Sequence, residues 1–380
     1  MRRPKLLFVV NDGPFFISHR LVLALAARDA GYEVAVACPA HRCIDRLVQE
    51  GLGYWELPMP RKRGRFDREL AAAWRLFAIL RRFRPDVAHL ITAKPVIVGG
   101  ICCRLLRIPV LAAISGLGHV FIADGVKARA MRLLILCGYW LALKRRHALV
   151  IFQNPHNREI FERAAIVGRR AVTIRGSGAD LALFDPSPCI NEEPVVALPA
   201  RMLWTKGVGE FVEAAKILRA SGVRARFMLA GDTDAGNPAS IEAAQLRSWD
   251  ESGAVEWIGY RTDIAAFLRE IDLVVLPSYL EGLPKTIIDA AAAGRATVTT
   301  DVPGCRDAIV DQETGLLVRV RDSGDLAEKI AVLLHDTERR RAMGRAARDF
   351  AEREFAIERI VDQHLDSYAR LLGECRRDPA

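Results

Sequence analysis

Short apolar runs alternate with longer helical patterns through most of the chain, and this alternation is the feature that most restricts the fold. In the first part of the chain the apolar runs read as buried strands at residues 5–10, 34–37, 87–90, 110–114 and 149–152. Helical patterns fill the spaces between them. Such βαβα repetition predicts a parallel sheet that is covered by helices on both faces.

A second series of the same kind starts at residue 195 and continues through 227–230, 255–258, 273–277, 297–300 and 316–318. A turn-rich stretch at residues 176–188 separates the two series and is the best boundary. Since 380 residues also exceed one ordinary domain, we expect an α/β protein with two Rossmann-like, doubly wound domains in tandem. Ligands of open α/β sheets bind at the carboxyl ends of the strands, so the expected site is a cleft between the two sheets.

Charge is divided unevenly between the two halves of the chain. Residues 1–175 carry 30 Lys and Arg against 12 Asp and Glu, whereas the remainder carries 25 against 34. A protein that coats nucleic acid uniformly would not show this division, so we expect no nucleic-acid partner. A first domain that faces anions fits the pattern.

Neither a membrane span nor a metal site is expected from the sequence. No run reaches the roughly 18 apolar residues of a spanning helix, and the run at residues 6–10 ends at Asn11, as a strand would. The eight cysteines are scattered without a Cys-x-x-Cys pair, which favours reduced, buried thiols. The sequence therefore predicts a cytoplasmic protein.

The loop after the first strand contains one glycine, Gly13, where a dinucleotide-binding fold would need three. We therefore do not expect NAD binding. A single glycine still allows a phosphate to approach the start of the following helix. A plain turn glycine is the alternative.

Two loops of the second series could bind a diphosphate and its neighbouring hydroxyl groups. Arg201 and Lys206 follow the first strand of that series and could converge on one diphosphate; two unrelated surface cations are the alternative. Further on, Pro284 suits the first turn of a helix, so the N–H groups of Gly282 and Leu283 would point at an anion. Carboxylates on either side of this turn, Glu281 and Asp289, could bind hydroxyls of a sugar and a ribose, or could be only a cap and a surface side chain.

These loops occur among stretches that together resemble the family 4 glycosyltransferases of the GT-B fold, over the whole chain. The chain is most similar to bacterial enzymes that build surface polysaccharides, such as capsule and lipopolysaccharide, and lipid-linked glycans. The matching stretches are residues 15–20, 89–95, 115–121, 151–154, 175–178, 201–207, 281–284 and 300–306.

The resemblance implies a retaining hexosyltransferase that uses a nucleoside-diphosphate sugar, with no cofactor and no required metal. A UDP-linked hexose or N-acetylhexosamine is favoured. The positions that match Arg201 and Lys206 hold the donor diphosphate in this family, and together with Glu281 they are the expected catalytic residues. A Glu pair separated by seven residues holds the donor sugar and the ribose, and here Glu281 is followed by Asp289, one methylene shorter.

Two further positions depart from the family pattern, and the domain limits follow from its plan. His119 stands where close relatives have Tyr, and Thr205 where they have Asp. His119 could contact the donor sugar as a catalytic residue or could be a structural loop histidine. The plan implies an acceptor-binding domain at 1–180, a nucleotide-sugar domain at 190–355, and a C-terminal helix at 356–380 that packs back on the first domain.

Cations in the first domain indicate an anionic acceptor and membrane surface. They form two clusters: Arg61, Lys62, Arg63 and Arg65 in a loop, and Lys127, Arg129, Lys144 and Arg145 around an apolar segment. Apolar residues between basic ends are typical of an interfacial helix on an anionic leaflet, although a solvated loop and a core helix with solvated ends are the alternatives. A polyprenyl-diphosphate-linked glycan acceptor would account for both clusters and would place the enzyme on the cytoplasmic face of the inner membrane.

Two other functions are compatible with parts of the pattern. A nucleotide-sugar 2-epimerase shares the fold and would turn over donor without an acceptor. A non-enzymatic membrane- or nucleic-acid-binding adaptor would leave Arg201, Lys206 and Glu281 unexplained.

Overall fold

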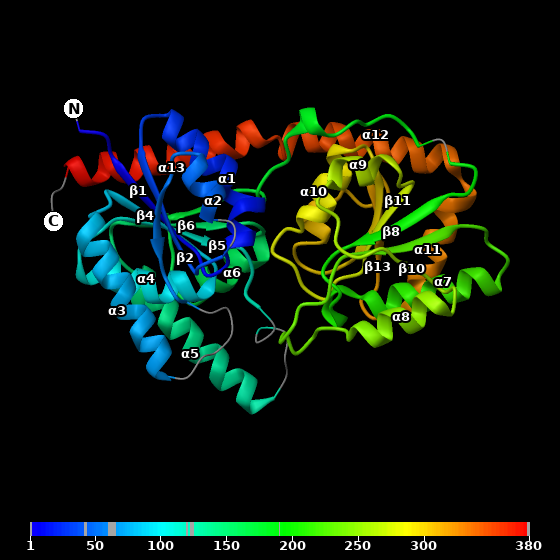
Figure 1. Ribbon diagram of the computed structural model, residues 1–380, viewed down its shortest axis with the longest axis horizontal. Helices are drawn as coiled ribbons and strands as arrows, with labels where there is room; N and C mark the ends of the chain where they lie inside the picture. Colours follow the sequence, from blue (N-terminus) through cyan, green and yellow to red (C-terminus); the bar gives the residue numbers. More distant parts are fainter. Residues whose placement is uncertain are drawn as a thin grey trace. The chain divides into compact units, whose positions relative to one another are not determined.

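A computed structural model of the protein describes residues 2–41, 44–59, 66–118, 121, 125–189 and 191–377. The chain forms two compact units, each an α/β unit with a parallel sheet (Figure 1). Unit 1 consists of Met1–Ser177 together with Ile360–Ala380, and unit 2 of Gly178–Arg359. The expected α/β fold with two doubly wound sheets is confirmed.

In the described part of unit 1, the strands pair in parallel in the order β3-β2-β1-β4-β5-β6-β7. Their bounds are β1 Lys5–Val9, β2 Glu33–Cys38, β3 Gly53–Glu56, β4 Val87–Ile91, β5 Val110–Ile114, β6 Ala148–Phe152 and β7 Ala171–Thr173. Strand β1 lies between β2 and β4, so the strand order reverses there. This reversal is the point where open sheets of this kind leave a crevice at the carboxyl ends of the strands.

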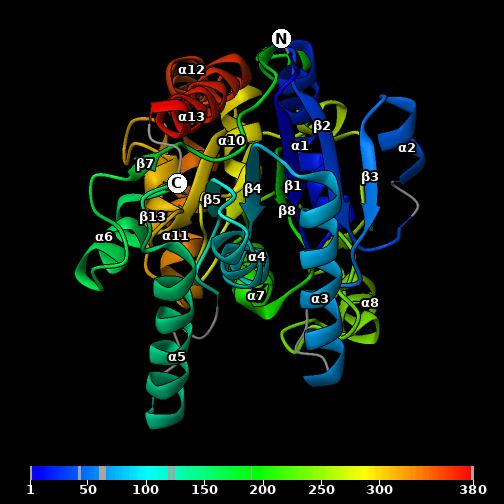
Figure 2. The same ribbon diagram turned by 90° about the vertical axis from the view of Figure 1, so that its left-hand side faces the viewer.

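Helices cover both faces of this sheet, as Figure 2 shows. Their bounds are α1 Gly13–Asp29, α2 Ile44–Gln49, α3 Phe66–Phe83, α4 Ala93–Leu105, α5 Val126–Leu143, α6 Pro155–Arg163 and α13 Ile357–Arg377. Helices α3, α4, α5 and α6 contribute to one apolar core with residues such as Leu7 and Val9 of β1. The alternate residue Phe8 points to the other face and contacts Phe16 of α1 at a ring distance of 5.4 Å.

Helix α13 packs on that second face through buried polar contacts. His89 of β4 shares a hydrogen bond of 2.8 Å with the Tyr368 hydroxyl, and His364 lies with its ring 5.7 Å from that of His89. Both histidines are fully buried, and the Arg20 side chain of α1 is buried beside them. The end of the chain therefore belongs to the core of unit 1.

In the described part of unit 2, parallel strands follow the order β10-β9-β8-β11-β12-β13. Their bounds are β8 Val195–Pro199, β9 Arg226–Ala230, β10 Glu256–Trp257, β11 Leu273–Leu276, β12 Ala296–Thr300 and β13 Gly315–Val318. The order reverses between β8 and β11. The loops that leave these two strands at their carboxyl ends are therefore neighbours.

Two apolar cores lie on the two faces of the second sheet. The helices that enclose them are α7 Val208–Ala220, α8 Ala243–Glu251, α9 Ile264–Arg269, α10 Lys285–Ala292, α11 Ser323–His335 and α12 Thr337–Glu354. Helices α7, α8 and α11 contribute to one core, and α9, α10 and α12 to the other. Both faces are covered, which explains why the central strands are apolar without alternation.

Candidate active site

The two loops of unit 2 that the sequence singled out leave adjacent strands. The loop with Arg201 and Lys206 follows β8, and the loop with Glu281 follows β11. Gly207 has φ +72°, and a Cβ there would lie 2.2 Å from the Pro277 carbonyl oxygen. Only glycine fits this close approach, so Gly207 lets the two loops pack together.

Lys206 and Glu281 form an ion pair across these loops. They are 75 residues apart in the sequence, and their side chains keep only 20% and 12% of their surface exposed. A cation and a carboxylate held in one partly desolvated place can interact strongly with a charged or hydroxylated ligand. The structure thus joins two of the residues that the sequence assigned to catalysis.

Arg201 does not join this pair but forms an ion pair with Asp234. The Asp234 carboxylate also accepts from Nδ2 of Asn237 at 3.1 Å. Backbone hydrogen bonds, including Trp204 N–H to the Ala239 carbonyl at 2.8 Å, fix the Asp234 segment against the Arg201 loop. Sequence reasoning missed Asp234, because an Asp in a turn after a strand carries no distinctive signal.

A second network, which the sequence did not reveal, fixes the loop after β11. The Tyr279 hydroxyl donates to Oε1 of Glu210 at 2.5 Å, and Tyr279 N–H donates to the Thr205 carbonyl at 3.0 Å. The Arg321 guanidinium lies 4.7 Å from the centre of the Tyr279 ring. Burial, reinforced by Glu210, raises the pKa of Tyr279 to about 12, so this hydroxyl keeps its proton and its hydrogen bond at neutral pH.

Gly304 allows the loop after β12 to approach Glu281. It has φ +86°, and a Cβ there would lie 2.4 Å from the Glu281 carbonyl oxygen. Glu281 N–H donates to the Pro303 carbonyl at 3.4 Å. The loop after β12 therefore contacts the backbone of Glu281, and the loop after β8 contacts the same β11 loop at Pro277 and Tyr279.

The turn from Gly282 to Pro284 is buried and leads into α10. Pro284 is the N-cap of this helix, and Lys285 is its first residue, so the helix starts one residue later than expected. No described side chain caps it, and the first amides of its backbone lack helical acceptors. Such a helix start favours a negative charge.

Asp289 lies one turn inside α10 and is buried, with an ion pair of 2.5 Å to Lys285. Burial raises the pKa of the Asp289 carboxyl, and the nearby Lys285 opposes this shift. We expect Asp289 to bind a ribose, and this contact stays a prediction. In the structure its carboxylate is held by a lysine of its own helix.

Gly13 belongs to unit 1 and starts α1, where the Asp12 carboxylate caps the helix by accepting from Phe15 N–H at 3.0 Å. Thr92, at the carboxyl end of β4, donates from its hydroxyl to Oδ1 of Asn11 at 2.9 Å. Gly13 therefore lies at the strand-order reversal of its own sheet. We retain it as an expected donor contact.

The predicted acceptor and membrane residues are placed only in part. His119, Arg61, Lys62, Arg63 and Arg65 lie outside the described residues. Lys127 and Arg129 are exposed on α5, and Lys144 is its C-cap, with its ammonium 5.2 Å from the Trp140 ring. Arg145 instead donates to the Ile108 carbonyl and is half-buried, so it anchors the end of α5 to unit 1.

The outer surface of α5 carries large apolar side chains that the sequence placed between the cations. Leu133 and Leu134 are 65% and 62% exposed, and Val126 is 81% exposed. Trp140 and Leu141 are also exposed. Over the described residues, no helix is long and apolar enough to cross a membrane. In the same part of the chain, no group of three or more His, Cys, Asp or Glu side chains could hold a metal ion.

Family models match both halves of the chain. The model described as glycosyl transferase 4-like matches residues 5–154, and the model described as glycosyl transferases group 1 matches residues 193–336. The chain belongs to the glycosyltransferases of this family, which confirms the expected hexosyltransferase class.

Individual relatives agree with this assignment. The N,N'-diacetylbacillosaminyl-diphospho-undecaprenol alpha-1,3-N-acetylgalactosaminyltransferase of Campylobacter jejuni is 30% identical, over 96% of this chain and 98% of its own. The UDP-Gal:alpha-D-GlcNAc-diphosphoundecaprenol alpha-1,3-galactosyltransferase of Escherichia coli is 23% identical over 77% of each chain. The crystal structure of Anabaena HepE in complex with UDP and glucose has a TM-score of 0.77 and 18% identity, covering 97% of this chain and 100% of that one. That structural likeness confirms the GT-B fold.

Proposed function

We propose that the protein transfers a hexose or N-acetylhexosamine from a nucleoside-diphosphate sugar, UDP-linked by preference, to a polyprenyl-diphosphate-linked glycan. The Lys206–Glu281 pair, beside the start of α10, is the observation that carries this proposal. The names of the Campylobacter jejuni and Escherichia coli relatives support the acceptor class, since both contain a diphospho-undecaprenol acceptor. The UDP bound to HepE supports the donor class.

The donor diphosphate would bind between the cations and the start of α10. Lys206 and Arg201 would exchange their carboxylate partners for phosphate oxygens, and the amides near Gly282 and Leu283 would donate to the same group. Glu281, released from Lys206, would accept from hydroxyl groups of the donor sugar. Asp289 would accept from the ribose, and Lys285 would keep it charged.

The reaction breaks the bond between the sugar and the leaving phosphate oxygen, and it forms a bond from the sugar to an acceptor hydroxyl oxygen. Negative charge develops on the leaving diphosphate, where Lys206, Arg201 and the helix amides would stabilise it. The departing phosphate oxygen would take the proton of the acceptor hydroxyl. Attack on the face that the phosphate leaves would retain the anomeric configuration, and these cations would make a divalent metal dispensable.

Substitution of Lys206 tests these roles. Lys206→Ala should lower transfer at saturating donor by at least about a hundredfold, because lost stabilisation of transition-state charge costs about 3 kcal/mol. Lys216→Ala on α7, which removes an exposed lysine paired with Glu213, should leave transfer unchanged. Undiminished transfer by Lys206→Ala would refute the assignment. Product NMR would test retention, and transfer in the presence of a chelator would test metal independence.

We further propose that the exposed face of α5 rests on an anionic membrane at the cytoplasmic surface, where the acceptor lipid is embedded. Leucines 65% and 62% exposed are costly in water but favourable in the headgroup region. Lys127 and Arg129 would contribute about 1 kcal/mol each near an anionic leaflet. The surface of α5 therefore combines the apolar contact and the electrostatic attraction that interfacial binding needs.

Vesicle binding tests this membrane proposal. The protein should sediment with anionic vesicles at low salt, and the pair Leu133→Gln and Leu134→Gln should weaken the binding at least about tenfold. Ile217→Gln on α7, which alters an apolar side chain 39% exposed in unit 2, serves as the control. Equal binding by all three proteins would rule out α5 as the contact.

A further inference from the structure

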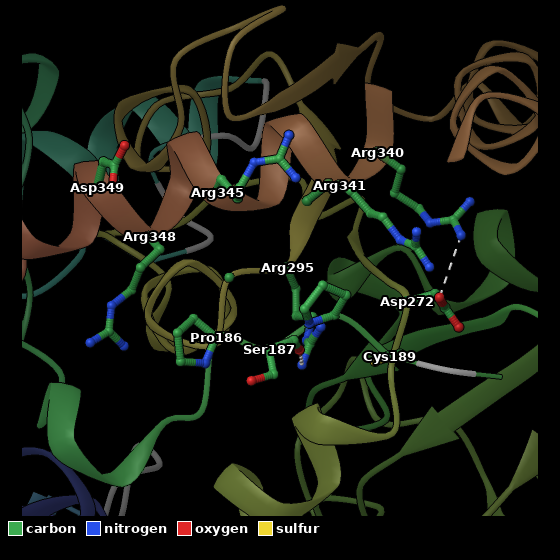
Figure 3. A pocket seen from close by; sticks show the side chains of 13 residues that line it. Pro186, Ser187, Cys189, Asp272, Arg295, Arg340, Arg341, Arg345, Arg348 and Asp349 are labelled. Atoms are coloured by element: carbon green, nitrogen blue, oxygen red, sulfur yellow. Dashed lines mark hydrogen bonds and ion pairs between the residues drawn. The ribbon is translucent and has the colours of Figure 1, made fainter. Parts of the chain in front are cut away.

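Unit 2 contains a cavity of about 500 Å³ at the end of its sheet where the strands begin, whereas the proposed donor site lies at the ends where the strands finish. Asp272 immediately precedes β11, and Gly294 and Arg295 lead into β12, so the cavity opens where these strands begin. Residues 186–189, ahead of β8, and the side chains of α12 complete its wall (Figure 3). A volume of this size is typical of a small-molecule site.

The cavity wall is strongly cationic, although this half of the chain is acidic overall. It contains five arginines and two aspartates: Arg295, Arg340, Arg341, Arg345, Arg348, Asp272 and Asp349. Figure 3 shows that most of these arginines come from one helix, α12, while Arg295 comes from the strand side. Like charges gathered in a concave wall raise the local potential for an anion.

The two deepest arginines are held rigidly by backbone carbonyls. Arg295 donates to the Leu268 and Ser187 carbonyls at 2.9 and 2.8 Å, and Arg340 donates to the Leu333 carbonyl at 2.7 Å. Both side chains are more than nine-tenths buried. Carbonyl oxygens orient a guanidinium but do not neutralise it, so the charge of Arg295 remains, whereas Arg340 is paired with Asp272 at 3.4 Å.

Asp272, the inner of the two aspartates, is already engaged elsewhere. Its Oδ2 accepts from Asn191 Nδ2 at 2.7 Å and from Val195 N–H at 3.0 Å. Its Oδ1 reaches only Arg340, at 3.4 Å. Among the residues that line the cavity, Asp272 is therefore the acid closest to the buried arginines, and its carboxylate is already shared among three donors.

Two further arginines of the wall have few contacts with the described residues. Arg341 and Arg345 lie four residues apart on α12, so they share one face of the helix. Arg341 approaches Glu338 no closer than 3.7 Å. Arg345 makes no hydrogen bond or ion pair with any residue that the structure describes. Arg345 can therefore turn toward a ligand without losing such a contact, and Arg341 would lose only its exposed pair with Glu338.

We infer that this cavity is a second anion site, which binds a soluble small molecule that carries a diphosphate or several phosphate groups. Planar guanidinium groups bind phosphate oxygens in pairs. Arg348 is paired with Glu352 at 2.7 Å. The other four arginines stand against two aspartates, and this surplus of two positive charges matches a ligand with about two negative charges. Orthophosphate alone would fill only a small part of the volume.

Inorganic pyrophosphate is the probe, and calorimetry of the full chain is the measurement. The parent protein carries Arg201→Gln and Lys206→Gln, so that pyrophosphate cannot report on the proposed donor site. It should bind pyrophosphate saturably, at one site, and more tightly than orthophosphate. Adding Arg341→Gln and Arg345→Gln should weaken pyrophosphate binding at least about tenfold, since two charge-assisted hydrogen bonds are lost.

A charge-matched control and a second measurement make this test decisive. Arg353→Gln with Arg359→Gln removes two exposed arginines outside the cavity and should leave the affinity unchanged. In the wild-type chain, pyrophosphate should protect Arg345, but not Arg353, from phenylglyoxal. Absence of saturable binding, an equal loss in the control pair, or protection by phosphatidate vesicles but not by pyrophosphate would overturn the inference.

Discussion

Acid should loosen helix α13 from unit 1, because two buried histidines at their contact, His364 of α13 and His89 of β4, must stay neutral. His364 Nδ1 lies 2.7 Å from the Ile360 carbonyl, which can only accept, so Nδ1 carries the proton and Nε2 is a buried acceptor without a donor among the described residues. Burial, assisted by the positive charge of Arg20, lowers the pKa of His364 from 6.5 to about 3. The pKa of His89 is lowered for the same reasons and by His364 as well.

The sign and size of the effect follow from these pKa values. In the unfolded segment His364 takes up a proton near pH 6.5, and in the folded one only near pH 3. The neutral His364 therefore costs no stability above pH 6.5, and the free energy of unfolding falls as the pH drops from 6.5 toward 3. At about pH 5 the loss from His364 alone is about 2 kcal/mol. His89 adds to the loss.

Hydrogen exchange measures the opening of this segment by itself, whereas thermal unfolding of a protein with two units does not give a free energy for one segment. The free energy of opening of residues 360–374 should fall by at least about 2 kcal/mol between about pH 7.5 and pH 5. His364→Leu, which fills similar space without titrating, should show about 2 kcal/mol less pH dependence. His156→Gln on α6, an exposed histidine of the same unit, is the control. An unchanged pH dependence in His364→Leu would refute the reasoning.

Three further substitutions probe the site of unit 2. Gly207→Ala should destabilise unit 2 by more than about 1–3 kcal/mol, which is the cost of an alanine in a left-handed conformation, because its Cβ would also clash with the Pro277 carbonyl. Gly222→Ala, at φ +79° with no described atom within 4 Å of the added Cβ, should show only the backbone cost. Chemical denaturation of both variants measures the difference. Tyr279→Phe should lower the free energy of unfolding by about 1–3 kcal/mol and reduce transfer, because the half-buried Glu210 carboxylate loses its donor. Stability equal to wild type would contradict this. Asp289→Asn should raise the donor KM at least about tenfold with a smaller change in kcat, and an unchanged KM would exclude ribose contact.

The central strands and their order of appearance could be predicted from the sequence, and so could β10 and β13 at the edges of the second sheet, but the edge strands β3 and β7 of unit 1 could not. Strands such as β4 and β5 are buried along their whole length and give continuous apolar runs. Strand β3, Gly53–Glu56, lies at the sheet edge with no fully buried residue, and β7 is only three residues long. Their sequences therefore lack the signal on which strand prediction rests.

The site was predictable where residue type and loop position coincide, and not where it depends on long-range pairing. Lys206 and Glu281 could be singled out because each follows a recognisable strand. Their direct ion pair depends on the close approach at Gly207, which only tertiary packing fixes. Asp234 and Glu210 have no local signature at all, and their roles come from contacts with Arg201 and Tyr279.

The central claim is acceptor-dependent transfer from a nucleoside-diphosphate sugar, and mass analysis of the acceptor tests it most directly. The purified protein would be incubated with UDP-, GDP- and ADP-linked sugars, with and without a polyprenyl-diphosphate-linked glycan. We predict that the glycan gains one hexose or one N-acetylhexosamine from one donor, preferably UDP-linked, and that the donor persists without acceptor. Conversion of the donor in the absence of acceptor, with no gain in acceptor mass, would contradict the claim and favour an epimerase.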